Sequence, residues 1–101
     1  MDKPEVTPHS EGQNIPVERV QIGVRMEKRM VKVLKALAEY LDISLGDLLE
    51  GIVLHAFEGK KLPFSDLTLQ KIAQLKEVYG MDYDASASHH LTEGLARKTE
   101  A

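Results

Sequence analysis

The stretch that decides the predicted fold is residues 20–26, which read Val20-Gln21-Ile22-Gly23-Val24-Arg25-Met26. Apolar residues alternate here with polar or small ones, which is the period of a β-strand with one buried and one exposed face. The side chains predicted to point inward are Val20, Ile22, Val24 and Met26. The 101 residues contain no second run of this kind, so the strand would lack a backbone partner within its own chain. The sequence therefore predicts an antiparallel pair of strands across a two-fold axis, which makes the chain a homodimer.

Charge is distributed unevenly around this stretch. The whole chain has a net charge of −3, and residues 1–18 carry −3, but residues 19–35 carry +5. The six basic residues of this region are Arg19, Arg25, Lys28, Arg29, Lys32 and Lys35, and Glu27 is its one acidic residue. Positive charge gathered on the predicted strand and the following helix is typical of a surface that contacts nucleic acid. A solvated helix face is the alternative interpretation.

Composition narrows the class of protein. With no cysteine, the chain has no disulfide, thiolate metal site or cysteine nucleophile. No stretch approaches the roughly 20 apolar residues of a membrane span, and the N-terminus lacks the basic and apolar regions of a secretory leader, so we expect a cytoplasmic protein. No nucleophile elbow, phosphate loop or convincing metal-ligand spacing occurs, so we expect no catalytic residues, no metal and no cofactor.

Two amphipathic helices are predicted after the strand. Apolar residues with helical spacing predict a helix over about 27–41. Ser44, followed three residues later by Asp47, predicts the N-cap of a second helix that ends at about Glu58, before Gly59. Two apolar faces of this width favour a core of four helices from two chains. The predicted dimer core consists of Val20, Ile22, Val24, Met26, Leu34, Leu37, Leu48 and Ile52.

This order of basic strand, helix, short turn and helix resembles the ribbon-helix-helix (MetJ/Arc type) family of DNA-binding repressors, over roughly residues 19–58. The resemblance implies a mainly α fold, in which two chains share a two-stranded antiparallel β-ribbon that enters the major groove. It makes Gln21, Gly23 and Arg25 the residues that contact bases, and the amides near Ser44, Leu45 and Gly46 a clamp for a DNA phosphate. Arginine and glutamine suit this role, since they bond guanine and adenine edges with two hydrogen bonds each.

Further phosphate contacts are predicted at the flanks of the strand. Arg19 precedes it, and Lys28 and Arg29 begin the first helix, where their charge opposes the helix dipole. A placement that destabilises the helix favours a use elsewhere, and contact with backbone phosphates is the use that we expect.

The rest of the chain is predicted to surround this domain. Residues 1–18 contain Pro4, Pro8 and Pro16 and are expected to form a flexible arm, and residues 19–59 form the DNA-binding and dimerisation domain. Residues 60–80 are expected to hold a linker and a third helix, capped by Ser65 and ending near Tyr79 before Gly80. Residues 81–101 are expected to be a mobile polar tail. The apolar side of the third helix is expected to pack on its own dimer, with binding of a protein partner through residues 65–79 as the alternative.

We therefore expect a DNA-binding transcriptional repressor. The alternative is an antitoxin or dimeric interaction protein on the same scaffold that binds DNA weakly or not at all. An ordinary helix-turn-helix is disfavoured because residues 45–58, which would hold its recognition helix, contain no lysine or arginine.

Overall fold

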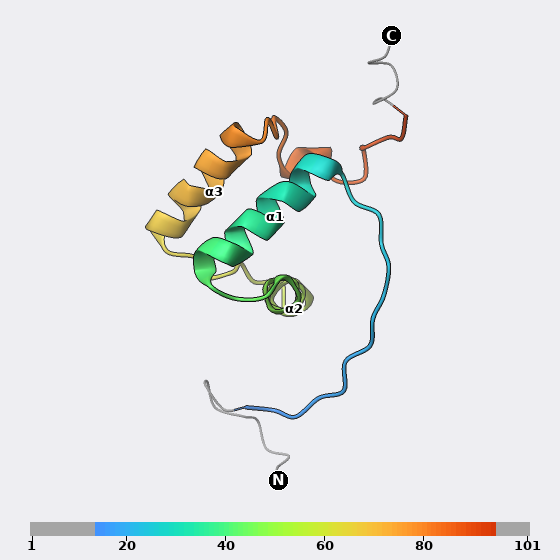
Figure 1. Ribbon diagram of the computed structural model, residues 1–101, viewed down its shortest axis with the longest axis vertical. Helices are drawn as coiled ribbons and strands as arrows, with labels where there is room; N and C mark the ends of the chain where they lie inside the picture. The colour runs from blue at the N-terminus through green and yellow to red at the C-terminus, as the bar shows by residue number, and fades with distance from the viewer. Residues whose placement is uncertain (1–13, 95–101) are drawn as a thin grey trace.

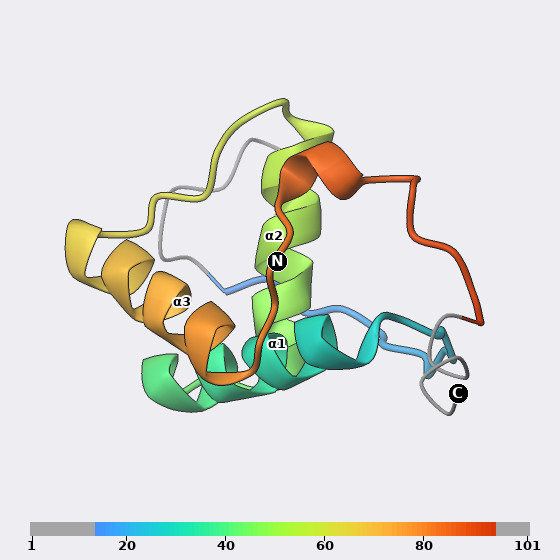
Figure 2. The same ribbon diagram turned by 90° about the horizontal axis from the view of Figure 1, so that it is seen from above.

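The computed structural model describes residues 14–94 of the chain. The elements of this part are α1 (Lys28–Leu41), α2 (Leu45–Phe57), α3 (Asp66–Val78) and a short 3-10 helix, η1 (Ala85–Ala87). The helices α1 and α3 lie side by side and run in opposite directions, and α2 crosses α1 (Figures 1 and 2).

The helices begin at side chains that accept hydrogen bonds from free backbone amides. Ser44 accepts from the amide of Asp47 at 3.0 Å, and Ser65 accepts from the amide of Thr68 at 3.1 Å. Both predicted serine caps are confirmed, and all three helices begin and end within two residues of their predicted bounds. The cap of α1 is Glu27, whose carboxylate accepts from the first amides of that helix. Local sequence thus fixes these helices.

A small core joins the helices. Its buried side chains are Val33, Leu37 and Ala38 of α1 and Leu48 of α2. The partly buried side chains packed around it are Leu34, Leu41, Ile43, Ile52, Phe64, Ile72 and Leu75. Because Ile72 and Leu75 belong to α3, this part of its apolar side packs within the single chain, and the expected packing on a dimer stays a prediction. Of the predicted dimer core, Leu37 and Leu48 are buried here, and Leu34 and Ile52 are partly buried against them.

The predicted β-ribbon is wrong for the fold that the structure describes: residues 14–94 contain no strand. Residues 20–26 form an extended segment that leads into α1 and stands clear of the helices to one side (Figure 1). Val20, Ile22 and Val24, predicted to point inward, are 78%, 75% and 70% exposed, and Met26 is 42% exposed. The physical reason is that an alternating pattern favours extended backbone, whereas a strand also needs a backbone partner. Residues 14–94 supply none, so the described fold is a three-helix arrangement preceded by a segment without helix or strand.

The C-terminal segment returns to the start of α1 (Figure 1). There Tyr83 is partly buried and donates a hydrogen bond to Glu27, so the start of the expected polar tail is packed against the helices. The rest of the predicted tail, residues 95–101, lies outside the described residues, as do residues 1–13 of the predicted arm. Residues 14–18 are exposed and form neither helix nor strand.

Candidate nucleic-acid interface

The extended segment carries the residues predicted to contact DNA bases. Gln21, Gly23 and Arg25 are all exposed, and a Cβ added at Gly23 would meet nothing within 4 Å. Packing within the chain therefore does not require glycine at this position. Residues 14–26 are all exposed in the single chain. The alternating apolar and polar side chains of residues 20–26 therefore do not form one buried face and one exposed face there.

Arg19 is joined to α2 by an ion pair with two hydrogen bonds. Its Nε donates to Oε2 of Glu50 at 2.8 Å, and its Nη2 donates to Oε1 at 2.9 Å. The hydrogen bonds raise the pKa of Arg19 and lower the pKa of Glu50. The charge of Asp47 also raises the pKa of Arg19, although less. The predicted phosphate contact Arg19 thus lies near the first half of α2, beside two carboxylates.

Arg25 has a looser partner. Its Nη2 lies 3.4 Å from Oε1 of Glu93, and the two side chains are 87% and 81% exposed. An ion pair with this exposure is weak, because water solvates both charges. Most of the Arg25 guanidinium therefore remains open to a ligand.

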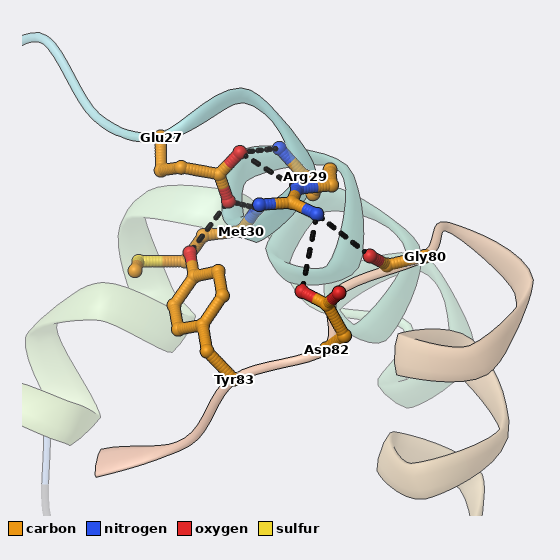
Figure 3. A network of polar contacts seen from close by, with 6 residues as sticks. All are labelled: Glu27, Arg29, Met30, Gly80, Asp82 and Tyr83. Carbon is orange, nitrogen blue, oxygen red and sulfur yellow. Dashed lines mark hydrogen bonds and ion pairs between the residues drawn. The ribbon is translucent and has the colours of Figure 1, made fainter. Parts of the chain in front are cut away.

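The guanidinium of Arg29 contacts other residues of the same chain (Figure 3). Its Nε donates to Oε2 of Glu27 at 3.0 Å, and its Nη1 donates to the carbonyl oxygen of Gly80 at 2.9 Å. The same Nη1 lies 3.3 Å from a carboxylate oxygen of Asp82, and the guanidinium lies 5.5 Å from the centre of the Tyr83 ring. Sequence reasoning assigned Arg29 to a DNA phosphate, but the structure uses it to hold residues 80–83 against the start of α1. The neighbouring Lys28 is exposed, and its contact with a DNA phosphate stays a prediction.

Glu27 is the centre of this network. Burial would raise the pKa of its carboxyl, but hydrogen bonds from Tyr83, Arg29 and Met30 outweigh that effect and lower the pKa to about 2. Burial, followed by the hydrogen bond to Glu27, raises the pKa of Tyr83 to about 12. The ionised carboxylate and the neutral phenol therefore stabilise each other, and α1 begins at a charged cap.

The start of α2 is the predicted phosphate clamp. Leu45 is partly buried, Ser44 and Gly46 are exposed, and the Ser44 hydroxyl already accepts from the amide of Asp47. The first amides of a helix have no acceptor within the helix, so those of Leu45 and Gly46 can donate to an anion. Asp47 weakens this site because its carboxylate repels a phosphate.

The structure brings only part of the predicted site together. Arg19 lies near the first half of α2 through Glu50, whereas Arg25, Lys28 and Arg29 cluster in sequence around the start of α1. The partners that sequence reasoning missed are Glu27, Glu50, Tyr83 and Glu93. Only Glu27 could have been found from local sequence, because it stands directly before the predicted helix, where an acidic side chain can cap the first amides. The other three contacts join residues 31, 68 and 56 positions apart, which no local pattern reveals.

Comparisons with known proteins add no relative: no family model, no curated protein and no solved structure matches this chain. Within residues 14–94, no three histidine, cysteine, aspartate or glutamate side chains are grouped so that they could hold a metal ion. In the same part of the chain, every helix is too short or too polar to cross a membrane.

Proposed function

We propose that this chain is a DNA-binding transcriptional regulator that contacts DNA through residues 19–28. The observation that carries the proposal is an exposed, extended segment with two arginines in a region of net charge +5. The proposal rests on this charge and exposure, and not on a β-ribbon. It includes the cytoplasmic location expected from the sequence.

The chemistry of the segment suits a duplex. The guanidinium of Arg25 can donate two hydrogen bonds to a guanine, and the amide of Gln21 can bond an adenine. Arg19 and Lys28, on either side, are suited to backbone phosphates, which supply affinity without sequence information. Gly23 between them has no side chain, so the backbone can approach DNA closely at that point.

A second copy of the chain is the proposed partner for the exposed apolar side chains. Besides Val20, Ile22 and Val24, the end of α2 exposes Leu54 (62%) and Phe57 (83%). Large apolar side chains exposed to water are unfavourable, and association is a common way to cover them. A dimer would also double the number of arginines that face DNA.

Sedimentation over a range of protein concentrations tests the dimer. Ile22→Ser should weaken association, because it replaces an exposed apolar side chain of the extended segment with a polar one. Leu67→Ser is the matched control, since Leu67 on α3 is 69% exposed, close to the 75% of Ile22. A wild-type chain that stays monomeric at high concentration would refute self-association.

DNA binding is tested by selecting bound sequences from random duplexes and then titrating salt. Affinity should fall steeply as salt rises, because phosphate contacts release counterions. For the selected sequence, Arg25→Ala should cost about 1–3 kcal/mol of base discrimination. Arg25→Lys is the control that keeps the charge but loses the planar guanidinium, so it should lose discrimination while preserving the salt dependence. A flat salt response, or an Arg25→Ala variant with unchanged discrimination, would reject DNA binding by this segment.

The second candidate is an antitoxin or dimeric interaction protein that binds DNA weakly or not at all. It is favoured by the acidic net charge of −3 and by exposed apolar side chains on α3, where Leu67 is 69% and Val78 is 72% exposed. Self-association without any salt-dependent binding to duplex DNA would favour this candidate.

A further inference from the structure

Both exposed arginines of the extended segment face a carboxylate from a distant part of the chain. Arg19 pairs with Glu50 of α2, 31 residues away, and Arg25 contacts Glu93, 68 residues away. Two glutamates that share no local sequence pattern thus meet the two arginines that the proposed function assigns to DNA.

The Arg19–Glu50 pair has the geometry of an arginine bound to a phosphate. Two oxygens of one anionic group accept from Nε and Nη2 of one guanidinium, at 2.8 and 2.9 Å. Both side chains are exposed to solvent, with exposed fractions of 67% for Arg19 and 46% for Glu50. An ion pair of this exposure contributes little to folding, but it occupies the same donors that a phosphate needs. The contact by Glu93 is longer, at 3.4 Å, and involves one donor.

We propose that Glu50 is an internal competitor of DNA phosphate: it occupies Arg19 in the free protein and must be displaced when DNA binds. This inference rests on the proposed function, because it concerns the control of the same site. Displacement lowers the affinity for every duplex equally, since phosphate contacts carry no sequence information. The same free-energy cost raises the Kd of specific and of non-specific duplexes by the same factor, so the ratio between them does not change. Glu50 is therefore a residue that limits the overall affinity for DNA, and random-sequence duplexes report its effect as well as a specific site does.

The charges around Arg19 agree with this role. Asp47 lies one turn before Glu50 on α2 and adds a second negative charge near Arg19. An approaching phosphate is repelled by both carboxylates until Arg19 turns away from Glu50. The extended segment that carries Arg19 is exposed and belongs to no helix or strand, so only the ion pair itself has to open at this residue.

The experiment measures binding of a fluorescent random-sequence duplex by anisotropy at fixed salt. Glu50→Gln should tighten binding about two- to fivefold, the range that corresponds to the loss of one exposed ion pair. Glu77→Gln, an exposed glutamate of α3, is the matched control for the change in net charge and should give a smaller effect. Circular dichroism checks that both variants keep their helices.

A second pair of variants separates competition from general repulsion. If Glu50 acts through Arg19, then in an Arg19→Ala background the change Glu50→Gln should improve binding no more than Glu77→Gln does. An equal gain from Glu50→Gln and Glu77→Gln in the wild-type background, or a full gain without Arg19, overturns the inference alone. Wild-type protein that shows no salt-dependent binding to the duplex rejects the proposed function, and the inference with it.

Discussion

Tyr83→Phe should destabilise the fold by removing one hydrogen bond while the aromatic ring stays in place. The Tyr83 hydroxyl donates to Oε1 of Glu27, the carboxylate that caps α1. A hydrogen bond to a charged group contributes about 1.5–3 kcal/mol. The side chain of Glu27 is 22% exposed, so water can partly replace the lost donor, and we expect a loss of about 1–2 kcal/mol. For a chain of this size, each kcal/mol lowers Tm by about 4–8 °C.

The assay for Tyr83→Phe is urea unfolding at pH 7, followed by circular dichroism at a fixed protein concentration. Tyr40→Phe is the matched control, because Tyr40 is 46% exposed and contacts Lys71 through its ring, which phenylalanine retains. The denaturant dependence m should not change, since the two proteins expose the same surface on unfolding. If Tyr83→Phe and Tyr40→Phe have the same unfolding free energy, the hydrogen bond to Glu27 does not hold the C-terminal segment and the reasoning fails.

Three further predictions concern the same fold. The pKa of Glu27 is about 2 in the folded chain, below the ordinary glutamate value of about 4.3. The ionised carboxylate therefore contributes its full stability above pH of about 4.3, and this contribution is lost as the pH falls toward 2. Between these two pH values, the unfolding free energy of Glu27→Gln, measured with urea, should depend less on pH than that of wild type. The pKa of Tyr83 is raised to about 12, so the stability contributed by its neutral phenol is present below pH of about 10 and is lost as the pH rises through 12. In an ultraviolet titration, wild type should show a tyrosine ionisation step near pH 12, and a Tyr83→Phe variant that retains this step would contradict the assignment. Leu37→Ala empties part of the buried core and should cost about 2–5 kcal/mol in urea unfolding. Leu67→Ala, at a 69% exposed position of α3, should cost under about 0.5 kcal/mol, and equal costs would contradict the core assignment.

The helices could be predicted because their determinants are local. Ser44 and Ser65 are strong caps, and Gly59 and Gly80 have positive φ angles of 67° and 69° directly after their helices, where glycine is favoured. The apolar stripe of α1 identified Leu37 as a core residue, although in this structure its partners come from its own chain. Periodicity shows which face is buried, but not which chain covers it.

The extended segment and the candidate site could be predicted only in part, because their structure depends on distant residues. Alternation predicted a strand at residues 20–26, and this was wrong because the pairing that makes a strand depends on a partner that the pattern does not contain. Arg29 was assigned to DNA because its charge opposes the dipole of α1. The structure resolves this conflict through Glu27, which lies closer to the helix start and neutralises that charge.

The network at Glu27 joins residues 80–83 to the start of α1, beside the segment proposed to contact DNA. The backbone of Glu27 is not helical, with φ −59° and ψ 134°, so this residue sets the direction from which residues 20–26 enter α1. Its carboxylate is fixed by Tyr83 and Arg29, and Arg25 precedes it by two residues. Two virtual Cα–Cα bonds span less than about 8 Å, so the Cα atom of Arg25 stays within this distance of the Cα atom of Glu27. The C-terminal segment therefore acts on the proposed interface at two points: Tyr83 fixes the cap two residues after Arg25, and Glu93 contacts Arg25 directly.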